Sequence, residues 1–436
     1  MTEKQLAAID KAAEQAKQGR AQLVCGLPGM EKTKAAITYC SLHPESLYFS
    51  FRKLDAQFAP LAFASRYPQI FDHCRTWEEF FQPLLAYSKE KRPTVFFDSA
   101  GERNDKDSFY EELSRFQESG QGTAGFVFIG RPWENFPIEY NTIPAEKNTV
   151  SELRHYGGSD IETEELLKIS GLTAMIPALL SEYDFSLKAD ANIRKMLRTD
   201  SAFYRLANDW MRDSFRAPEA YNTLLYAMTH GYNRISELAT FTGFPKNKCD
   251  KYLKALAAHG LIRKEERQNG HSRYYPENDY LTLWYSTLLT AVPTADGSFS
   301  EETCKVFMQV FNDTVMPRQY RKLCHRWLQD HLGSIPGVGK EALNPANYNV
   351  ELNGIIFDFA CFSGRPVFAL CITKPDELIR RHEWQEIVKA TTQSSPFYDN
   401  EYVICSMVRP ADSLWTATRG VENVCIHQKN TIMGSF

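Results

Sequence analysis

The chain has 436 residues, enough for two to four domains at roughly 100–200 residues per domain. Hydrophobic residues make up 43% and charged residues 24%, as in ordinary globular proteins, and a net charge of -4 excludes a uniformly basic surface that binds nucleic acid. The ten cysteines form no C-x-x-C pair and no zinc-type spacing with histidine, which favours reduced thiols in a cytoplasmic protein. Because the sequence has no apolar run of about 18 residues, we expect neither secretion nor a membrane span.

The first 150 residues alternate between helical and apolar segments. A helix is expected over residues 1–20, then a strand at Gln22–Cys25 and a helix at Lys34–Cys40. Three further apolar runs, separated by the helical segments 76–91 and 106–119, are Leu47–Phe51, Thr94–Phe97 and Phe126–Ile129. Short buried strands that alternate with helices predict an α/β fold with a parallel sheet and helices on both faces.

The first strand leads directly into Gly26-Leu27-Pro28-Gly29-Met30-Glu31-Lys32-Thr33. The phosphate-loop pattern G-x-x-x-x-G-K-[ST] is kept at Gly26, Lys32 and Thr33, and Gly29 can also shape the loop. In such loops backbone N–H groups surround phosphate oxygens at a helix N-terminus, the lysine reaches the terminal phosphates, and the hydroxyl binds Mg²⁺. The sequence therefore predicts a P-loop NTPase sheet with ATP and Mg²⁺ as cofactors.

The second glycine of the pattern is replaced by Glu31. At roughly 5 Å from a phosphate and an effective dielectric of about 20, the repulsion is about 3 kcal/mol per unit charge. The carboxylate could instead occupy the anion-binding loop itself, since the helix dipole favours a negative group there. A plain strand–turn–helix connection is the alternative to a binding loop.

A strand ending in Val95-Phe96-Phe97-Asp98 places an acidic residue at the carboxyl end of the sheet. P-loop enzymes place the aspartate that orients Mg²⁺ at such a position, so Thr33 and Asp98 are the predicted metal ligands. The next residue is Ser99, where ATPases of this class usually have a glutamate that orients the attacking water. The catalytic residues are therefore unidentified. Arg131, after the strand at Phe126–Ile129, could contact a phosphate or simply lie on the surface.

The middle of the chain changes to short helices and a hairpin. Residues 151–215 suit a small helical lid, in which Gly171 and Pro177 are expected to be structural caps. From residue 216 to 292, three short helices are followed by two strands at 261–264 and 271–275. This order predicts a winged helix-turn-helix.

The third helix and hairpin of this module carry eight basic side chains against three acidic ones, a surplus of five positive charges. A local surplus of this kind is expected where a protein contacts DNA phosphates. Lys246, Asn247 and Lys248 would lie nearest the groove, and Arg263 and Arg273 lie on the hairpin. The alternative is a module that contacts proteins.

In this order, the motifs resemble the archaeal-type AAA+ ATPase family. The resemblance covers nearly the whole chain and is carried by five segments: Gly26–Thr33, Phe97-Asp98, Gly171–Pro177, Ser236–Leu261 and Tyr280–Tyr285. Members join a P-loop ATPase domain, a helical lid, a winged helix and a C-terminal restriction-nuclease-like domain. The resemblance therefore implies a degenerate nuclease-like α/β domain at 299–436.

Nucleases of that kind need an acidic residue on a helix, then Asp, then Glu-x-Lys on the next strand. Asp358 matches the central Asp, but the helix position reads Tyr320-Arg321 and the last motif reads Cys371-Ile372-Thr373. Because one carboxylate cannot hold a catalytic Mg²⁺ ion, we expect no nuclease activity.

The sequence thus predicts four domains, at 1–150, 151–215, 216–292 and 299–436. It favours an ATPase-family protein with a degenerate nucleotide site, little or no hydrolysis, and a regulatory or DNA-associated role. An active ATPase that switches the winged helix, or a scaffold that acts through protein partners, are the alternatives.

Overall fold

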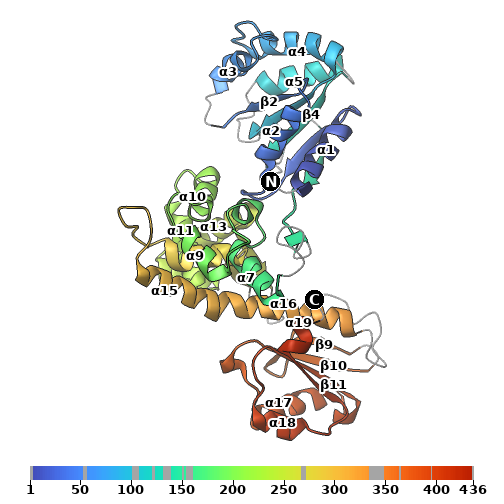
Figure 1. The fold of residues 1–436 in the computed structure, drawn as a ribbon, viewed down its shortest axis with the longest axis vertical. Coiled ribbons are helices and arrows are strands. Elements are labelled where there is room, and N and C mark those ends of the chain that lie inside the picture. The colour runs from blue at the N-terminus through green and yellow to red at the C-terminus, as the bar shows by residue number, and fades with distance from the viewer. Residues whose placement is uncertain are drawn as a thin grey trace. The chain divides into compact units, whose positions relative to one another are not determined.

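The computed structural model describes residues 3–52, 56–100, 108–119, 123–130, 139–149, 152–153, 161–266, 272–332, 348–362, 365–393 and 395–434. They form two compact units, shown in Figure 1. Unit 1 comprises Met1–Thr149 and Met175–Tyr183, and unit 2 comprises Val150–Ala174 and Asp184–Phe436. The chain thus returns to unit 1 after α7 (Thr163–Thr173), inside the segment expected to form the lid.

Unit 1 is built around a five-stranded parallel sheet with the order β2-β3-β4-β1-β5. The strands are β1 (Ala21–Cys25), β2 (Leu47–Ser50), β3 (Thr94–Asp98), β4 (Gly125–Gly130) and β5 (Tyr140–Pro144). The helices are α1 (Glu3–Ala16), α2 (Lys32–Leu42), α3 (Ala59–Arg66), α4 (Trp77–Lys91), α5 (Ser108–Ser119) and α8 (Pro177–Leu180). The predicted α/β fold with a parallel P-loop sheet is confirmed.

Both faces of this sheet are buried, as the continuous apolar runs predicted. On one face, alternate strand residues such as Leu23, Phe49 and Phe97 join an aromatic cluster with α3, α4 and α5. On the other face, α1 and α2 present small side chains, and the Tyr39 ring of α2 packs against Phe96 at 5.4 Å. Because strand side chains alternate between faces and helices cover both faces, every residue of β1 and β3 is buried.

Unit 2 begins with helices. These are α7, α9 (Ala189–Met196), α10 (Ala202–Ser214), α11 (Glu219–Thr229), α12 (Ile235–Thr242) and α13 (Lys246–Ala258). The antiparallel hairpin of β6 (Ile262–Glu265) and β7 (Arg273–Pro276) follows α13. The three helices and the hairpin expected of a winged helix are therefore present in the predicted order.

A long helical stretch leads from the hairpin to the C-terminal sheet. It comprises α14 (Asp279–Leu283), a π-helical turn at Trp284–Leu288, α15 (Glu301–Val310), a second π-helical turn at Phe311–Val315, and α16 (Met316–Leu332). The Tyr280 hydroxyl donates to the Phe203 carbonyl at 2.8 Å and accepts from the Ala207 N–H at 2.8 Å, which fixes α14 to α10. The aromatic segment Tyr280–Tyr285 is thus part of the core of unit 2.

The C-terminal sheet is mixed and has the order β12-β11-β10-β9-β8. Its strands are β8 (Tyr348–Leu352), β9 (Ile355–Cys361), β10 (Val367–Ile372), β11 (Glu401–Ser406) and β12 (Val424–Gln428). Strands β8, β9 and β10 pair antiparallel, and β10, β11 and β12 pair parallel. The helices that follow β10, β11 and β12 are α17 (Arg381–Thr392), α18 (Asp412–Thr418) and α19 (Lys429–Gly434). The C-terminal α/β sheet is present, and its relation to nucleases remains a prediction.

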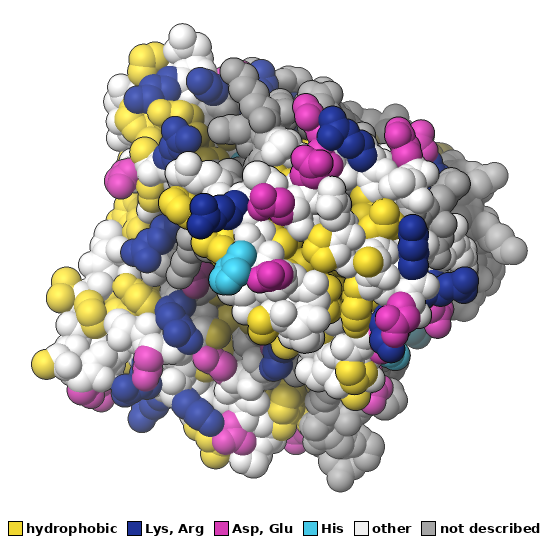
Figure 2. Space-filling view, turned by 90° about the horizontal axis from the view of Figure 1, so that it is seen from above, with side chains coloured by type: hydrophobic (Ala, Val, Ile, Leu, Met, Phe, Trp, Pro, Cys, Tyr) yellow, Lys and Arg dark blue, Asp and Glu magenta, His cyan; other side chains and the backbone are white. Residues whose placement is uncertain are grey.

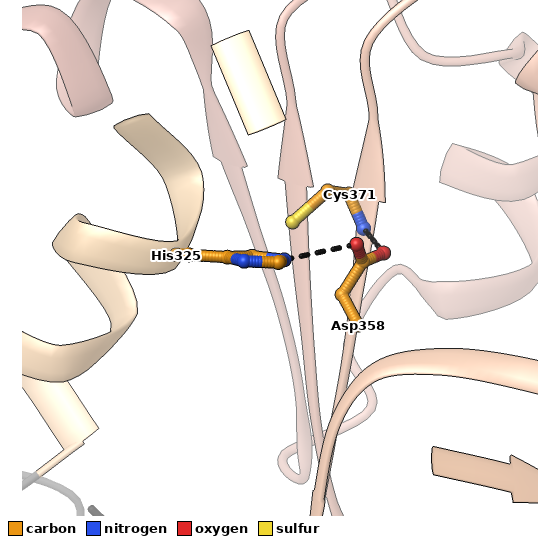
Figure 3. Close-up of side chains that lie close together, drawn as sticks. All are labelled: His325, Asp358 and Cys371. Atoms are coloured by element: carbon orange, nitrogen blue, oxygen red, sulfur yellow. Dashed lines mark hydrogen bonds and ion pairs between the residues drawn. The ribbon is translucent and has the colours of Figure 1, made fainter. Parts of the chain in front are cut away.

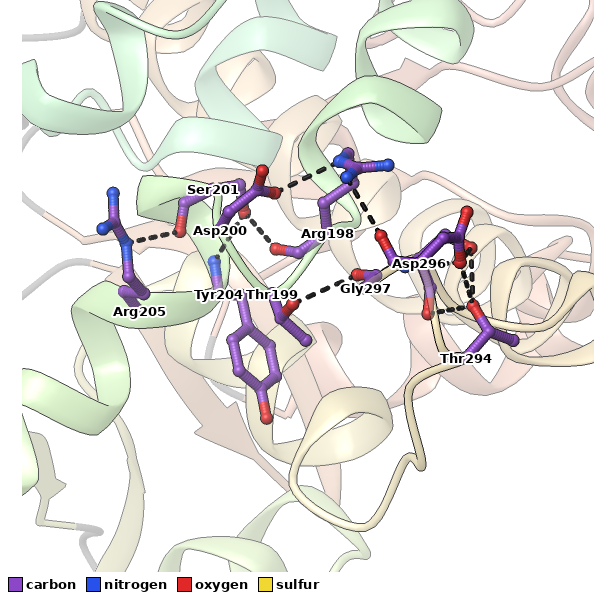
Figure 4. A network of polar contacts seen from close by, with 10 residues as sticks. Arg198, Thr199, Asp200, Ser201, Tyr204, Arg205, Thr294, Asp296 and Gly297 are labelled. Carbon is purple, nitrogen blue, oxygen red and sulfur yellow. Dashed lines mark hydrogen bonds and ion pairs between the residues drawn. The ribbon is translucent and has the colours of Figure 1, made fainter.

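A polar network ties the start of α10 to the loop before α15 (Figure 4). The Thr199 N–H donates to the Gly297 carbonyl at 2.9 Å, and the Arg198 guanidinium donates to the Asp296 carbonyl at 3.2 Å. Hydrogen bonds from Thr294 and Ser298 lower the pKa of Asp296 to about 2. The loop at 293–298 is thus held by backbone as well as side-chain contacts.

The surface shows no segregation of charge on the face drawn in Figure 2, where Lys and Arg side chains lie among Asp and Glu. This agrees with the small net charge of the chain. Among the helices that the structure describes, none has both the length and the apolar character needed to cross a membrane.

Gly171 does not end a helix, contrary to the expected cap. It lies inside α7, whose C-cap is Ala174 in a left-handed conformation with φ 47°. A Cβ atom at Gly171 would lie 2.8 Å from Val315 Cγ1 and 3.3 Å from Gln319 Cγ. The glycine therefore allows α7 to pack closely on the helical stretch that ends in α16. Pro177 starts α8, as a capping residue should.

We expect Gly171→Ala to lower the free energy of unfolding of unit 2 by about 1–3 kcal/mol, because the added methyl group overpacks the contact with Val315. Gly434→Ala is the control, since nothing lies within 4 Å of a Cβ there. Urea unfolding of the full chain measures both. Equal stability of the two variants would contradict the close packing of α7.

Candidate functional site

The loop between β1 and α2 is shaped by two glycines. Gly26 has φ 156° and Gly29 has φ 82°, both positive. A Cβ atom at Gly26 would lie 2.9 Å from the Ala145 carbonyl oxygen, so only glycine fits where the chain passes the end of β5. The Gly29 carbonyl accepts a hydrogen bond from the Ala178 N–H of α8 at 2.9 Å. The returning segment 175–183 thus supports the loop, a contact that the sequence did not suggest.

Lys32 is the first residue of α2, and its ammonium group folds back over the loop. Its Nζ donates to the carbonyl oxygens of Gly26 at 2.9 Å and Leu27 at 3.0 Å. The positive charge therefore lies over the loop, where a terminal phosphate would be held in a P-loop protein.

Thr33 and Asp98 meet at the carboxyl end of the sheet, as predicted. The Thr33 hydroxyl donates to Asp98 Oδ2 at 2.6 Å. Tyr48 of β2 donates to the same oxygen at 2.6 Å, and the Ser99 hydroxyl donates to Oδ1 at 3.2 Å. Because burial and the negative charge of Asp98 raise the pKa of Tyr48, its phenol remains a donor at neutral pH. The sequence gave no indication of Tyr48, whose strand lies next to β3 in the sheet.

Glu31 adopts the backbone conformation that the missing glycine would supply. Its φ of 53° and ψ of 23° are left-handed, a conformation that costs a residue with a side chain roughly 1–2 kcal/mol. Its carboxylate lies 3.3 Å from the Lys34 ammonium group, one turn along α2. Lys34 therefore partly compensates the negative charge, and the loop keeps its shape despite the substitution.

The predicted DNA-binding residues of the third helix lie at its exposed N-terminal end. Lys246, Asn247 and Lys248 are all exposed in the first turn of α13. The Lys248 ammonium group lies 4.4 Å from the centre of the Phe244 ring and 5.5 Å from that of Tyr252. The cation is thus held against two aromatic rings, while no acidic partner of Lys246 or Lys248 occurs within the described ranges.

The two arginines of the hairpin, Arg263 and Arg273, are less available for contacts with DNA than the lysines of α13. Arg263 donates to the Pro276 carbonyl at 2.7 Å and pairs with Glu265 at 3.2 Å, so its charge is already partly compensated. Arg273 is half-buried in β7, opposite Glu265 in the hairpin register. Each of the three acids also has a basic partner, since Asp250 pairs with Lys254 and Glu266 with Lys264. The positive surplus is therefore concentrated on α13 rather than on the described part of the hairpin.

Asp358 of β9 is buried in a network of hydrogen bonds. It receives hydrogen bonds or ion pairs from Arg321, His325 and the Cys371 N–H. Asp358 is thus surrounded by an arginine, a histidine and a cysteine, and its correspondence to a nuclease aspartate stays a prediction. Arg131 lies outside the described residues.

No family model matches the sequence, and no curated protein matches it. Among solved structures, the chain is similar to Drosophila ORC bound to AT-rich DNA and Cdc6, with 11% identity over 65% of this chain and 91% of that one, and a TM-score of 0.25. A variant of Thermotoga maritima RuvB has 17% identity over 61% and 89%, with a TM-score of 0.29. PCH-2 of C. elegans has 12% identity over 58% and 66%, with a TM-score of 0.23. The functional assignment rests on the loop geometry itself.

Two substitutions separate the charge of Glu31 from its backbone conformation. Glu31→Gln removes the charge, whereas Glu31→Gly also removes the left-handed strain. We expect both to bind Mg·ATP more tightly than the wild type, the glycine variant by up to about 100-fold, since about 3 kcal/mol of repulsion is relieved. Isothermal titration calorimetry measures the affinities, with Glu118→Gln on α5 as control.

If neither variant at residue 31 gains affinity over wild type, Glu31 does not oppose phosphate binding. A gain confined to the glycine variant would assign the effect to the backbone rather than to charge.

Proposed function

We propose that the chain binds ATP with Mg²⁺ in the loop of unit 1 and hydrolyses it slowly or not at all, in a regulatory role. The observation that supports this most strongly is the 2.6 Å hydrogen bond between Thr33 and Asp98, next to a lysine folded over the loop. A plain turn between a strand and a helix needs none of these three side chains. Their convergence is what a phosphate and metal site requires.

The residues present fit this ligand pair. Lys32 would exchange its bonds to two loop carbonyls for phosphate oxygens, while Gly26 and Gly29 supply the positive φ angles of the loop backbone. Thr33 and Asp98 offer a hydroxyl and a carboxylate oxygen, which are the ligand types that Mg²⁺ prefers. The metal would neutralise phosphate charge, and Tyr48 would hold the Asp98 carboxylate in place through its own hydrogen bond.

Slow hydrolysis follows from the residue after Asp98. Ser99 has a left-handed backbone with φ 61°, its N–H donates to the Ile129 carbonyl at 2.8 Å, and its hydroxyl donates to Asp98. A serine hydroxyl in this arrangement is no base for an attacking water, unlike the glutamate usual at this position. We therefore expect this chain to bind ATP and to hydrolyse it slowly or not at all.

The nucleotide proposal is tested by titration of the full chain with ATP, with and without Mg²⁺. We expect wild-type binding that Lys32→Ala weakens at least tenfold, because the phosphate loses its cation. Lys91→Ala, at the exposed end of α4, should leave the affinity unchanged. Release of inorganic phosphate is measured in parallel.

Turnover of about 1 s⁻¹ or more, the usual range of enzymes, would contradict the regulatory role and favour an active ATPase switch. If wild type and Lys32→Ala bind equally, or neither binds, the loop is not a nucleotide site and the scaffold interpretation gains.

We further propose that unit 2 contacts DNA through the N-terminal turn of α13. The supporting observation is the exposed pair Lys246 and Lys248, which have no acidic partner within the part of the chain that the structure describes. Asn247 lies between them and can donate or accept at a base edge. In winged helix-turn-helix proteins the recognition helix enters the major groove with its N-terminal residues foremost, which suits this turn.

The double variant Lys246→Ala/Lys248→Ala should bind duplex DNA more weakly than wild type, because two phosphate contacts are lost. Fluorescence anisotropy at several salt concentrations should show a log–log salt dependence shallower by about 1.8, or 0.9 per contact. Lys305→Ala on α15 is the control, because it removes one positive charge outside α13 and shows the effect of lost charge alone. An unchanged slope in the double variant would exclude α13 as the contact and favour a protein-binding module.

A further inference from the structure

Three side chains with metal-binding atoms converge in the C-terminal part of unit 2. His325 comes from α16, Asp358 from β9 and Cys371 from β10, and Figure 3 shows them pointing toward one another. One ligand atom from each lies within 4.8 Å of the other two. His325 Nε2 and Asp358 Oδ1 are 3.1 Å apart.

These separations are close to those around a tetrahedral ion. Nitrogen and oxygen ligands about 2.0–2.2 Å from zinc lie roughly 3.4 Å apart, and a sulfur at about 2.3 Å lies roughly 3.6 Å from either. The His325–Asp358 distance of 3.1 Å is slightly shorter, and the Cys371 sulfur lies within 4.8 Å of both ligand atoms. The three ligand atoms are therefore near enough to one another to share one ion.

Asp358 is oriented as carboxylate ligands usually are, by hydrogen bonds from behind. Its Oδ2 accepts from the Cys371 N–H at 2.6 Å, and its Oδ1 accepts from the Arg321 guanidinium at 2.7 Å. Arg321 also bonds to Glu377 at 2.8 Å, so it is held in place independently of Asp358. Contacts of this type fix the ligand and tune its charge.

The local charge is unbalanced before an ion binds. Asp358 and Glu377 are two carboxylates that share one cation, Arg321, and the Asp358 side chain is only 4% exposed. The two carboxylates thus exceed Arg321 by one negative charge. A divalent ion with the thiolate of Cys371 as a ligand would make the group neutral.

Two further thiols adjoin the site. Cys405 of β11 is the direct neighbour of Cys371 in the sheet register, and Cys324 precedes His325 on α16. All three cysteines are buried and free of disulfide bonds. The surroundings are thus rich in sulfur, which soft and borderline metal ions prefer.

We propose that His325, Asp358 and Cys371 bind a thiophilic divalent ion of the zinc class, with a structural role. Imidazole and thiolate are poor ligands for Mg²⁺, so this differs from a nuclease metal centre. The ion would join α16 to β9 and β10, which are distant in sequence. The spacing of these residues in the sequence, 33 and 13 residues apart, hides the site from any search for zinc motifs.

The test is titration of the metal-depleted full chain with Co²⁺, a spectroscopic substitute for zinc. We expect one equivalent to produce thiolate-to-cobalt charge-transfer absorption, and one equivalent of Zn²⁺ to displace it. Cys371→Ser should abolish that absorption. His325→Gln should weaken binding at least tenfold, and its partly exposed position makes misfolding a smaller risk. Cys425→Ser, at the exposed cysteine of β12 in the same sheet, is the control and should bind as wild type does.

Absence of the charge-transfer absorption in the wild type would overturn the proposal. Equal weakening by Cys371→Ser and Cys425→Ser would also overturn it, because it would indicate non-specific thiol binding. Circular dichroism of each variant without metal shows that the fold is retained. If Cys371→Ser does not fold, an affinity of His325→Gln equal to wild type decides against the site.

Discussion

The hydrogen bond between Thr33 and Asp98 is the contact on which the proposed nucleotide site depends. It joins the first turn of α2 to the end of β3, although β4 lies between β1 and β3 in the sheet. In a parallel sheet all carboxyl ends lie on one edge, where loops and helix N-termini meet. Because both partners are anchored in buried strands or the helix packed on them, the pair is held in position before any ligand arrives. Lys32, Gly26 and Gly29 then complete the site through the conformation of the loop alone.

Charge compensation explains how the loop tolerates Glu31. The left-handed conformation costs about 1–2 kcal/mol, and it is retained because the strand before it and α2 after it are both buried. Lys34 at 3.3 Å takes up part of the negative charge. A bound phosphate would therefore face a carboxylate whose negative charge Lys34 partly neutralises, rather than an isolated one. The substitution therefore weakens the site without dismantling it.

Sequence patterns predicted the elements better than the contacts between them. The strand expected at Gln22–Cys25 and the helix at 76–91 are found nearly in place, because buried apolar runs and a capping box at Thr76 are local signals. Gly171 was misassigned as a cap, since its close neighbour Val315 is 144 residues further along the chain. The same reason hid Tyr48, which reaches Asp98 across a neighbouring strand. Arg263 was counted as available for DNA because a count of basic and acidic residues does not show that Glu265 pairs with it.

The two polar sites differ in what has replaced their expected ligands. In unit 1 the hydroxyl and the carboxylate proposed to bind Mg²⁺ lie together. In the C-terminal sheet Asp358 is surrounded by Arg321, His325 and Cys371, and Glu377 shares Arg321 with it. A hard ion that activates water has no use for such a set, whereas a borderline ion or a buried proton does. The first site is therefore suited to ligand-dependent change and the second to holding α16 on its sheet. That division of roles matches a protein that senses a nucleotide more than one that cuts a substrate.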